Sequence, residues 1–470
     1  MQKTKIIATI GPACDDESTL RNMMTAGMNV ARLNLSHGSF EEHAARVERM
    51  RNVAQECGAN LAVMVDTRGR EIRSGEVEGS SITLEPGASF MLYGDARVGT
   101  DRGVSISHGT LHDHVKLHDR ILLDDGLIEL SVSGVALDGV SCIVECGGEL
   151  RNNKGVNVPG NPSVFDSIDS DVEGDLEFVA AHDVEYVAAS FIRDAADINR
   201  LRAKLDALGA DTPIIAKIES RGGVENLDGI IAVADGTMVA RGDLGVELPL
   251  AEGPTIQKHI IRSTVTNGKP VITATQMLDS MERNPRPTRA EVSDVANAIL
   301  DGTSAVMLSG ETAAGAYPVD AVRTLAELAT EAETGLSEFG HLQKILPHAS
   351  DRITDAVAHA AITMANNLRA AAIVALTETG FTSRLISKYR PNCPIVAISS
   401  SQSVVRRLAM NWGVNAIQYN GDGSDNDRLE FAMRAARESG YAGSGDIVIA
   451  TTGSHLRAGS TDLIRVLTLE

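Results

Sequence analysis

The sequence predicts an α/β protein built around a (β/α)8 TIM barrel, with a β domain inserted into the barrel and a second α/β domain after it. Three observations support this fold class. Eight short apolar, β-branched runs recur before residue 313, helix-like segments separate several of them, and a long stretch of different character follows the third run. Strands buried on both faces of a parallel sheet have this composition, and eight strand–helix units are enough to close a barrel.

The eight runs share an apolar centre without strict alternation, and each ends in polar residues. Helix-like segments such as 16–28 and 197–208 show apolar spacings near three and four, which are typical of amphipathic helices. An open, doubly wound sheet is the alternative architecture for the same order of elements. The runs are KIIATIGP (5–12), NVARLNLSHG (29–38), LAVMVDTRG (61–69), VEYVAASF (184–191), IIAKIES (214–220), TMVARGD (237–243), KPVITATQM (269–277) and SAVMLSGET (304–312).

The stretch between the third and fourth runs is too long for a βα connection. Residues 70–155 alternate apolar with polar residues and turn at Pro-Gly, Asp-Gly and Gly-Gly, a pattern typical of antiparallel hairpins. We therefore expect the barrel in two parts, 1–69 and 156–335, with an antiparallel β-barrel lid domain between them over its C-terminal face. Strand-like and helix-like segments alternate again over 340–470, which predicts a smaller, doubly wound α/β domain.

Composition and charge restrict the classes of function. The chain has 470 residues, 43% hydrophobic residues and a net charge of −20, which argues against nucleic acid or an anionic membrane as the main partner. No apolar run approaches the roughly 20 residues that span a bilayer. The N-terminal residues lack a secretory signal pattern, and the five cysteines form no CxxC pair or zinc grouping. We expect a cytoplasmic protein.

The polar residues at the ends of the predicted strands indicate where the chemistry lies, because strand C-termini of a barrel open into one pocket. Glu219 and Asp243 end adjacent strands, and two carboxylates this close repel unless a cation lies between them or one is protonated. Mg²⁺ (or Mn²⁺) is the natural occupant, with capping or salt-bridged acids as the alternative. Lys217 lies two residues before Glu219, and side chains two residues apart on a strand point the same way, so the ammonium and the carboxylate enter the same pocket. The full set is Arg32, Asn34, Ser36, His37, Asp66, Thr67, Lys217, Glu219, Arg241, Asp243, Thr275, Ser309 and Glu311.

A second group of oxygen-bearing residues follows the second and third strands. Asn34, Ser36, Asp66 and Thr67 carry one charge among them, which suits a monovalent cation such as K⁺ better than a second Mg²⁺. Helix caps and turns are the alternative use of these residues.

Several residues could bind anionic groups. Arg32 and Arg73 offer planar guanidinium groups to phosphate, and Lys154 lies on the hinge side of the inserted domain, where a solvated surface lysine is the alternative. The backbone N–H groups of Gly242 and Asp243 would form a site for a substrate carboxylate. The Thr275 hydroxyl could add one more donor.

Ten segments that carry these residues resemble the pyruvate kinase family, in the same order and between residue 4 and about residue 320. The resemblance implies phosphoryl transfer from phosphoenolpyruvate to ADP, giving pyruvate and ATP in the last step of glycolysis. It also implies Mg²⁺ and K⁺ as cofactors, a mobile lid, an allosteric C-terminal domain and a homotetramer. The segments are TKIIATIGPA, NVARLNLSHG, DTRGREIR, KGVNVPG, SFIR, AKIES, MVARGDLGVE, KPVITATQML, PRPTRAEVSDVANAILDG and MLSGETAAGAYP.

The resemblance also implies a role for each matching residue. Lys217, Arg32 and Thr275 are the catalytic residues; Lys217 stabilises the phosphoryl group in transfer, and Arg32 spans both substrates. Glu219 and Asp243 hold the divalent metal. The potassium ligands are Asn34, Ser36, Asp66 and, through its carbonyl, Thr67. Phosphoenolpyruvate binds Arg32, Lys217, Gly242, Asp243 and Thr275, and the nucleotide binds Arg32, Leu33, Asn34, Leu35, His37, Arg73 and Lys154.

Four positions refine this expectation. Glu71 stands where potassium-dependent members of the family carry glutamate, which predicts K⁺ dependence, and Arg70 replaces a common proline at the lid hinge. Glu378 and Phe381 replace basic residues in the segment TETGFTSR, where many members bind a sugar phosphate. We therefore expect another phosphorylated effector, or none, rather than fructose-1,6-bisphosphate.

Two other functions use the same residues. A barrel lyase or aldolase could handle a pyruvate enolate on the same metal pair, although it would leave the lid, Lys154 and the monovalent-cation group without a purpose. A non-catalytic metabolite sensor would need only the C-terminal domain. Pyruvate formation that does not depend on ADP would favour the lyase, and full turnover without the Lys217 ammonium would favour the sensor.

Overall fold

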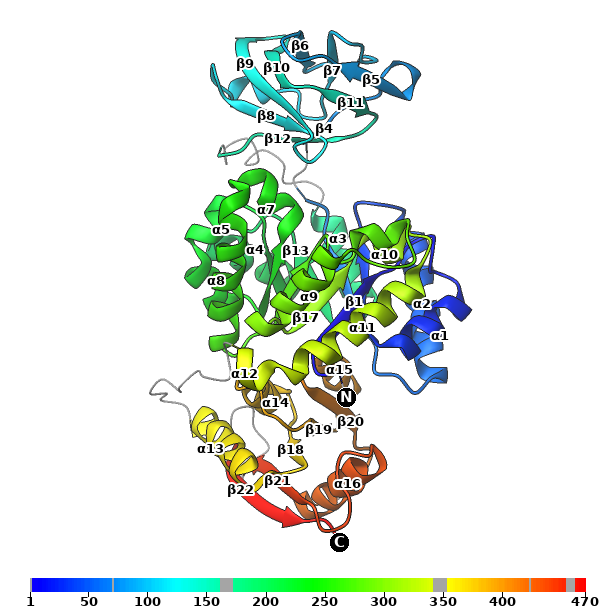
Figure 1. Ribbon diagram of the computed structural model, residues 1–470, viewed down its shortest axis with the longest axis vertical. Helices are drawn as coiled ribbons and strands as arrows, with labels where there is room; N and C mark the ends of the chain where they lie inside the picture. Colours follow the sequence, from blue (N-terminus) through cyan, green and yellow to red (C-terminus); the bar gives the residue numbers. More distant parts are fainter. Residues whose placement is uncertain (1, 70–71, 161–171, 341–352, 422–423, 454–460) are drawn as a thin grey trace.

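The computed structural model describes residues 2–69, 72–160, 172–340, 353–421, 424–453 and 461–470. Figure 1 shows three parts stacked along the long axis, with the inserted β domain at one end, the barrel in the middle and the C-terminal α/β domain at the other end. The N-terminus lies where the barrel meets the C-terminal domain, and the C-terminus lies at the far end of that domain.

Eight parallel strands close a barrel in the order β1-β17-β16-β15-β14-β13-β3-β2. This confirms the predicted (β/α)8 barrel, and the open-sheet alternative is wrong. Each predicted run overlaps one barrel strand, and the polar residues that end the run lie at the end of that strand or directly after it. The strands are β1 (Lys5–Thr9), β2 (Met28–Asn34), β3 (Ala62–Asp66), β13 (Tyr186–Ala189), β14 (Ile214–Ile218), β15 (Gly236–Ala240), β16 (Val271–Ala274) and β17 (Ala305–Leu308).

Helices cover the outside of the barrel. Ser39 and Thr288 begin α2 and α9 with capping boxes, in which the side chain accepts from a backbone N–H of the first turn and a glutamate returns the bond. The helices are α1 (Glu17–Ala26), α2 (Phe40–Glu56), α3 (Val172–Ala181), α4 (Ala195–Ala207), α5 (Arg221–Glu225), α6 (Leu227–Val233), α7 (Arg241–Glu247), α8 (Gly253–Thr266), α9 (Arg289–Asp301), α10 (Gly310–Ala313), α11 (Pro318–Thr334) and α12 (Leu336–Phe339).

The inserted domain is a curled β structure with its own apolar core. Its seven-stranded sheet has the order β4-β12-β8-β9-β10-β6-β7, and β11 pairs with β5 in a second, two-stranded sheet. The strands are β4 (Ile72–Arg73), β5 (Ser81–Leu84), β6 (Ser89–Tyr93), β7 (Gly103–Ser105), β8 (Arg120–Leu123), β9 (Ile128–Ala136), β10 (Gly139–Cys146), β11 (Gly148–Arg151) and β12 (Gly155–Asn157).

The antiparallel β-barrel expected here needs one correction. The outer strands β4 and β7 meet through an antiparallel bridge between Ser74 and Ile106, and Gly75 N donates to Ser105 O at 2.7 Å, so the sheet curls until its edges touch. However, β6 and β7 pair in parallel. The connection over 94–102 crosses back past the chain at Val77, which bridges Gly99, and therefore returns β7 in the direction of β6.

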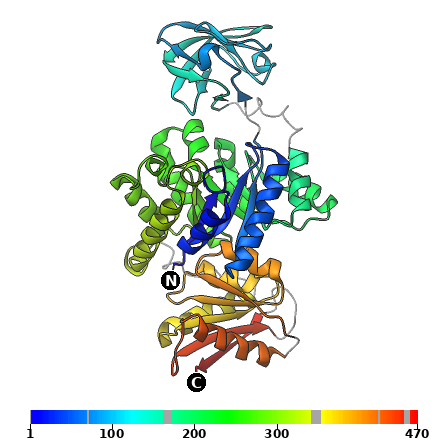
Figure 2. The same ribbon diagram turned by 90° about the vertical axis from the view of Figure 1, so that its right-hand side faces the viewer.

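The C-terminal domain has a five-stranded sheet with helices on both faces, as Figure 2 shows. Four strands are parallel and β22 is antiparallel to β21. The helices α13, α14 and α15 pack on one face and α16 packs on the other, which is the doubly wound arrangement. In order along the sheet the strands are β20 (Val414–Gln418), β19 (Ile395–Ser399), β18 (Ala372–Leu376), β21 (Ile447–Gly453) and β22 (Thr461–Thr468), and the helices are α13 (Ile353–Leu368), α14 (Phe381–Lys388), α15 (Gln402–Arg407) and α16 (Asp425–Glu438).

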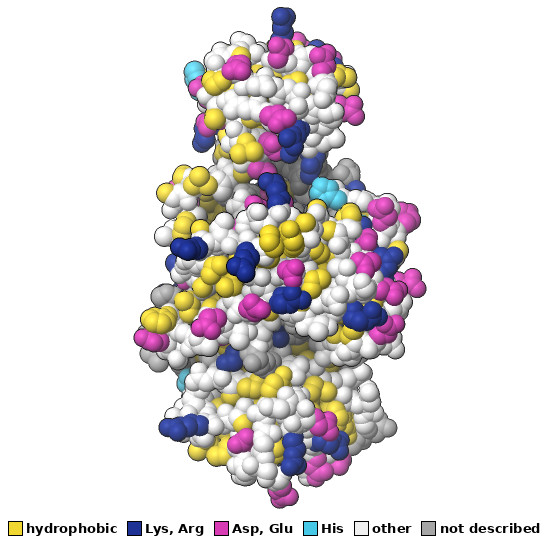
Figure 3. All heavy atoms as spheres, turned by 45° about the vertical axis from the view of Figure 1, so that its right-hand side comes forward, with side chains coloured by type: hydrophobic (Ala, Val, Ile, Leu, Met, Phe, Trp, Pro, Cys, Tyr) yellow, Lys and Arg dark blue, Asp and Glu magenta, His cyan; other side chains and the backbone are white. Residues whose placement is uncertain are grey.

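The surface in Figure 3 carries acidic and basic side chains side by side, and the molecule narrows between the inserted domain at the top and the barrel below it. Among the described residues, none of the helices combines the length and apolar character needed to cross a membrane.

Candidate active site

The alternation of side chains along each strand positions the polar residues at the C-terminal end of the barrel. In β14, Ile215 belongs to the apolar cluster inside the barrel, whereas Ile214 and Ala216 pack in the outer cluster beneath the helices. Both faces are buried, which explains why the sequence shows no alternation of apolar and polar residues. Because side chains two residues apart point the same way, Lys217 and Glu219 continue the inward series up to the rim.

Lys217 lies at the centre of a compact group of charges. Its Nζ atom is 3.0 Å from Asp66 Oδ1 and 2.8 Å from Glu219 Oε1, and it donates a hydrogen bond of 2.8 Å to Ser190 Oγ. Ser190 follows β13, which lies between the strands that carry the two acids. One ammonium group therefore serves as the counter-charge of two buried carboxyl groups.

Arg32, at the end of β2, is the second cation of this group. Its Nε donates to Asp66 Oδ2 at 2.8 Å, and its Nη1 donates to Thr9 Oγ1 at 2.9 Å. Burial alone would raise the pKa of the Asp66 carboxyl, but Lys217 and Arg32 hold that pKa below its usual value. Asp66 is therefore ionised at neutral pH.

The pKa of Glu219 is shifted in the opposite direction to that of Asp66. Burial raises the pKa of Glu219 to about 7; Lys217 opposes this rise and the Asp243 carboxylate adds to it. Burial would lower the pKa of the Lys217 ammonium, but Asp66, Glu219 and Asp243 together hold it above its usual value. The structure thus brings Glu219 and Asp243 close enough to repel each other, with a fully charged ammonium beside them.

The donor atoms of this acid pair fit a divalent cation. Glu219 Oε2 accepts the Phe191 N–H at 2.6 Å, and Phe191 adopts a left-handed backbone, with φ of +53°, at that position. Glu219 Oε1 is buried and, among the described residues, receives no directed hydrogen bond beyond its ion pair. A cation between the carboxylates would remove their repulsion.

The protein alone offers few ligands for such a cation. Within the described part of the chain, no group of three or more His, Cys, Asp and Glu side chains is placed to hold a metal ion. A metal on Glu219 and Asp243 would therefore complete its coordination with substrate oxygens and water, as Mg²⁺ commonly does in phosphoryl-transfer sites.

The four residues predicted to hold K⁺ gather at the ends of β2 and β3. Asn34 and Asp66 are direct partners in the parallel pairing. Asn34 Oδ1 accepts the Ser36 N–H at 3.1 Å, which is the local turn that the capping alternative predicts. The Thr67 carbonyl accepts from Ser190 Oγ at 2.8 Å. The four residues thus lie at two neighbouring strand ends, and the Asn34 side chain also forms part of the turn.

The predicted carboxylate-binding group lies at the ends of β15 and β16. The Gly242 N–H donates to Thr275 Oγ1 at 2.8 Å, so the hydroxyl and the backbone donor are adjacent. Thr275 and Gln276 both have left-handed backbones, with φ of +67° and +53°, a strain typical of functional sites. The Arg241 guanidinium supports this turn by donating to the Thr275 carbonyl, with Nε at 3.1 Å.

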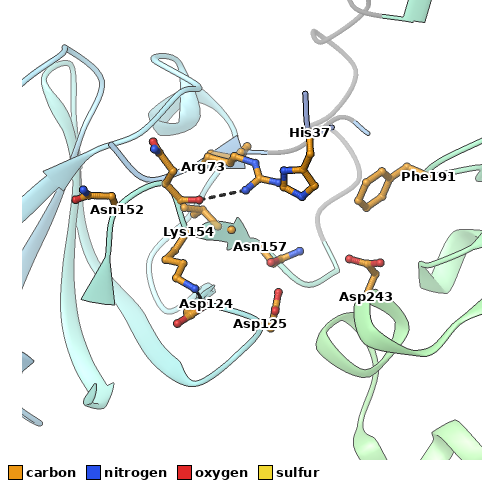
Figure 4. Close-up of a pocket in the computed structure, with 13 residues that line it drawn as sticks. His37, Arg73, Asp124, Asp125, Asn152, Lys154, Asn157, Phe191 and Asp243 are labelled. Carbon is orange, nitrogen blue, oxygen red and sulfur yellow. Dashed lines mark hydrogen bonds and ion pairs between the residues drawn. The ribbon is translucent and has the colours of Figure 1, made fainter. Parts of the chain in front are cut away.

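A cleft of about 300 Å³ lies between the inserted domain and the barrel. Figure 4 shows Arg73 and Lys154 on the inserted-domain side, Asp243 on the barrel side and His37 near the top between them. Lys154 Nζ is 2.8 Å from Asp124 Oδ1, and Arg73 Nη1 donates to a backbone carbonyl at 3.1 Å. The cleft thus joins three predicted nucleotide-binding residues to one predicted metal ligand.

Some predicted pocket residues have structural contacts instead. Besides supporting Thr275, Arg241 pairs with Asp294 at 2.5 Å. Glu311 accepts the N–H groups of Leu278 and Ser309 at 3.1 and 2.7 Å, which fixes the loops after β16 and β17.

The remaining predicted residues offer backbone contacts or lie outside the described residues. The side chains of Leu33 and Leu35 are buried in the outer cluster beneath the helices, so a nucleotide could reach only their backbone. Arg70 and Glu71 lie outside the described residues, and the expectations placed on them stay predictions.

Sequence reasoning missed Ser190, although a usable signal was present. Tyr186 and Ala188 belong to the cluster inside the barrel, so the period of two that identified Lys217 and Glu219 also points Ser190 inward. The run VEYVAASF ends in a serine and a phenylalanine, and a single hydroxyl drew less attention than the charged residues on the neighbouring strands.

Comparison with known proteins gives matches over nearly the whole chain. Residues 1–322 match the family described as "Pyruvate kinase, barrel domain", and residues 355–467 match "Pyruvate kinase, alpha/beta domain". A pyruvate kinase of Bacillus licheniformis is 46% identical over 469 residues, covering 99% of this chain and 80% of that protein. A pyruvate kinase of Geobacillus stearothermophilus is 46% identical with the same coverage. A pyruvate kinase of Clostridium acetobutylicum is 42% identical over 473 residues and is covered completely.

Proposed function

The chain belongs to the pyruvate kinase family and is a phosphotransferase that moves the phosphoryl group of phosphoenolpyruvate to ADP; from this premise we propose how its own residues divide the reaction. Family membership sets aside the lyase and the sensor. The observation that carries the proposal is the Lys217 ammonium, held at the rim of the barrel between the Asp66 and Glu219 carboxyl groups.

Lys217 and Arg32 supply the positive charge along the transferred group. Phosphoryl transfer depends on positioning and electrostatic stabilisation more than on covalent chemistry by the protein. A unit charge pair at 4 Å contributes about 4 kcal/mol at an effective dielectric of 20, before desolvation. Both cations lie at strand ends and form ion pairs with Asp66, which holds them in place. They therefore need little rearrangement to contact an incoming phosphate.

Glu219 and Asp243 hold the divalent metal, Mg²⁺ or Mn²⁺, in this proposal. The buried Glu219 Oε1, whose contact among the described residues is the Lys217 ammonium, and the raised pKa of that carboxyl support it. When bound, the metal supplies charge neutralisation and Lewis-acid polarisation of substrate oxygens. Asn34, Ser36, Asp66 and the Thr67 carbonyl hold K⁺, supported by their shared position at the ends of β2 and β3.

Substrate binding divides between the barrel and the inserted domain. The Gly242 N–H and the Thr275 hydroxyl bind the phosphoenolpyruvate carboxylate, supported by their adjacent positions at the ends of β15 and β16; the carboxylate would replace the Thr275 oxygen as acceptor of the N–H and the Ala274 carbonyl as acceptor of the hydroxyl. His37, Arg73 and Lys154 bind the nucleotide phosphates in the cleft of Figure 4. Closure of the inserted domain over this cleft would exclude water from the phosphoryl group.

The contacts of Glu378 in the C-terminal domain bear on regulation. Glu378 Oε2 accepts from Ser400 Oγ at 2.7 Å, and the same carboxylate pairs with Arg428. Glu378 therefore occupies the Ser400 hydroxyl and the Arg428 guanidinium, two groups that could otherwise bind an anion. This supports an effector other than fructose-1,6-bisphosphate, or none. We also propose a homotetramer and a cytoplasmic location; family membership supports both, and the five unpaired cysteines support the location.

The test combines ADP dependence with one substitution. We expect wild-type protein to form pyruvate from phosphoenolpyruvate only with ADP, Mg²⁺ and K⁺. Lys217→Met should lower kcat by about 10²- to 10³-fold, the usual loss of one preorganised charge, and leave the ADP requirement intact. Lys204→Met is the matched control, because Lys204 pairs with Glu173 on the exposed outside of the barrel. Near-wild-type turnover of Lys217→Met would refute the proposed role.

A further inference from the structure

Ser190 contacts the proposed machinery at three points, and neither the resemblance nor the comparisons assign it a role. Its Oγ accepts from Lys217 Nζ at 2.8 Å and lies 2.8 Å from the Thr67 carbonyl and 3.3 Å from Asp66 Oδ1. A serine hydroxyl has one proton to donate and can accept in addition. The one proton goes to the Thr67 carbonyl, which is the nearer acceptor, while a lone pair accepts from Lys217.

A reciprocal bond fixes the place of this hydroxyl. The Ser190 N–H donates to Thr67 Oγ1 at 3.2 Å, and Ser190 Oγ donates back to the Thr67 carbonyl. These two bonds tie the end of β13 to the end of β3. The hydroxyl thus has a defined position relative to Lys217, although the Ser190 side chain is only half-buried.

The contacts of Lys217 create a competition when cations bind. Asp66 and Glu219, its two carboxylate partners, are also the proposed ligands of the monovalent and the divalent cation. Each cation that binds takes oxygen atoms that the ammonium now contacts. Within the described residues, Ser190 Oγ is the one neutral acceptor bonded to Lys217 Nζ.

We propose that Ser190 is a positioning residue, whose hydroxyl keeps the Lys217 ammonium at the rim of the barrel when cations take the oxygens of Asp66 and Glu219. The inference rests on the proposed function, since it takes the metal ligands assigned there as given. With alanine at this position, the partners of Lys217 among the described residues would all be carboxylates, and metal binding would have to break those contacts without a replacement.

The test measures metal binding without turnover. Mn²⁺ binding is followed by electron paramagnetic resonance of the free ion, in the absence of substrates, for wild type, Ser190→Ala and Ser190→Thr. We expect Ser190→Ala to raise the Mn²⁺ dissociation constant by about three- to tenfold, the range for one lost hydrogen bond. Ser190→Thr keeps the hydroxyl and should restore most of the affinity. At saturating metal, kcat of Ser190→Ala should fall by more than the KM for ADP rises.

Two further variants separate the possible explanations. Ser304→Ala removes a buried hydroxyl that Val271 N and Arg390 contact at the opposite end of the barrel, and it should leave Mn²⁺ affinity unchanged. Glu219→Gln should abolish Mn²⁺ binding at this site; if it does not, the metal assignment fails whatever Ser190 does. If Glu219→Gln abolishes binding while Ser190→Ala binds and turns over as wild type, or Ser190→Thr is no better than alanine, the role of Ser190 is overturned.

Discussion

At the scale of single residues, the site is a balance of five charged groups in an acidic protein. The chain carries a net charge of −20, yet two anionic substrates must meet at the rim of the barrel. Asp66 pairs with both Arg32 and Lys217, whereas Glu219 pairs with Lys217 alone and so shares its one cation with Asp66. Burial raises the pKa of Glu219 to about 7, because the shared ammonium only partly opposes it and the Asp243 carboxylate adds to it.

This rise predicts how the stability of the metal-free protein depends on pH. The pKa of Glu219 rises from the usual 4.5 to about 7 in the folded state. Between these values the folded protein keeps a proton that the unfolded chain has released, so the free energy of unfolding falls as pH increases through this window. We expect Glu219→Gln to remove that part of the slope, measured by urea denaturation in chelator at pH values from 4.5 to 8.

The comparison of the two proteins isolates Glu219 from other titrating groups. The difference in free energy of unfolding between wild type and Glu219→Gln should change across the window and be constant above pH 8. Saturating Mg²⁺ should abolish the change in wild type, because the metal binds the ionised carboxylate. Parallel pH profiles for the two proteins in chelator would contradict the raised pKa.

At the scale of elements, the period of two along a strand decided how much could be predicted. It predicted the inward placement of Lys217 and Glu219 from IIAKIES. The structure agrees, because Ile215, two residues before Lys217, is buried inside the barrel. The eight runs gave the barrel, since composition alone marks a strand buried on both faces. Ser190 follows from the same rule, but only contacts across three strands reveal its partners.

Other features depend on information that no local pattern carries. The parallel pairing of β6 with β7 depends on the path of residues 94–102 across the domain. Arg241 and Glu311 have the residue types of a pocket, but backbone carbonyl and N–H groups of neighbouring loops take them as partners. A strand end shows which way a side chain leaves the sheet, not what it meets there.

The two chain segments that lead to the inserted domain are tied together at their base, which gives an element-scale prediction. Asp175, in the first turn of α3, is fully buried and accepts from Arg68 N at 2.7 Å and Arg68 Nε at 2.9 Å. Arg68 precedes the inserted domain and α3 follows it. Asp175→Asn should lower the free energy of unfolding by about 3 kcal/mol, because removing one partner of a buried ion pair leaves the other uncompensated.

A neighbouring acid on the same helix provides the control for Asp175. Glu173 pairs with Lys204 at 3.0 Å, but both side chains are exposed, so Glu173→Gln should change the free energy of unfolding by less than about 1 kcal/mol. Urea denaturation measures both variants. Equal effects of the two substitutions would show that the Arg68 contact does not anchor the hinge.

At the scale of the whole molecule, the C-terminal domain is joined to the barrel by polar contacts at the end opposite the site. Lys5 Nζ donates to the Val414 carbonyl at 2.7 Å, and an Arg390 Nη donates to the Gly302 carbonyl at 2.7 Å. Glu185, just before β13, accepts from Arg51 at 2.7 Å and also pairs with Arg406 of α15. The strand that carries Ser190 at one end thus carries an interdomain ion pair at the other.

Glu185 and Asp211 offer a matched pair of interdomain contacts, and they should behave differently. Glu185 is 2% exposed and its carboxylate faces two arginines, whereas Asp211, which pairs with Arg407 at 3.4 Å, has a side chain 96% exposed. Glu185→Gln should lower the free energy of unfolding by about 3 kcal/mol, because two guanidinium groups lose a buried counter-charge.

Calorimetry adds a second readout to that substitution, since a weakened junction should let the C-terminal domain melt before the barrel. Asp211→Asn should cost less than about 1 kcal/mol and keep one transition, as an exposed ion pair is screened by water and salt. If Glu185→Gln melts in one transition at the wild-type temperature, the apolar and backbone contacts alone hold the domains together. A split transition in Asp211→Asn would instead assign the junction to its surface charges.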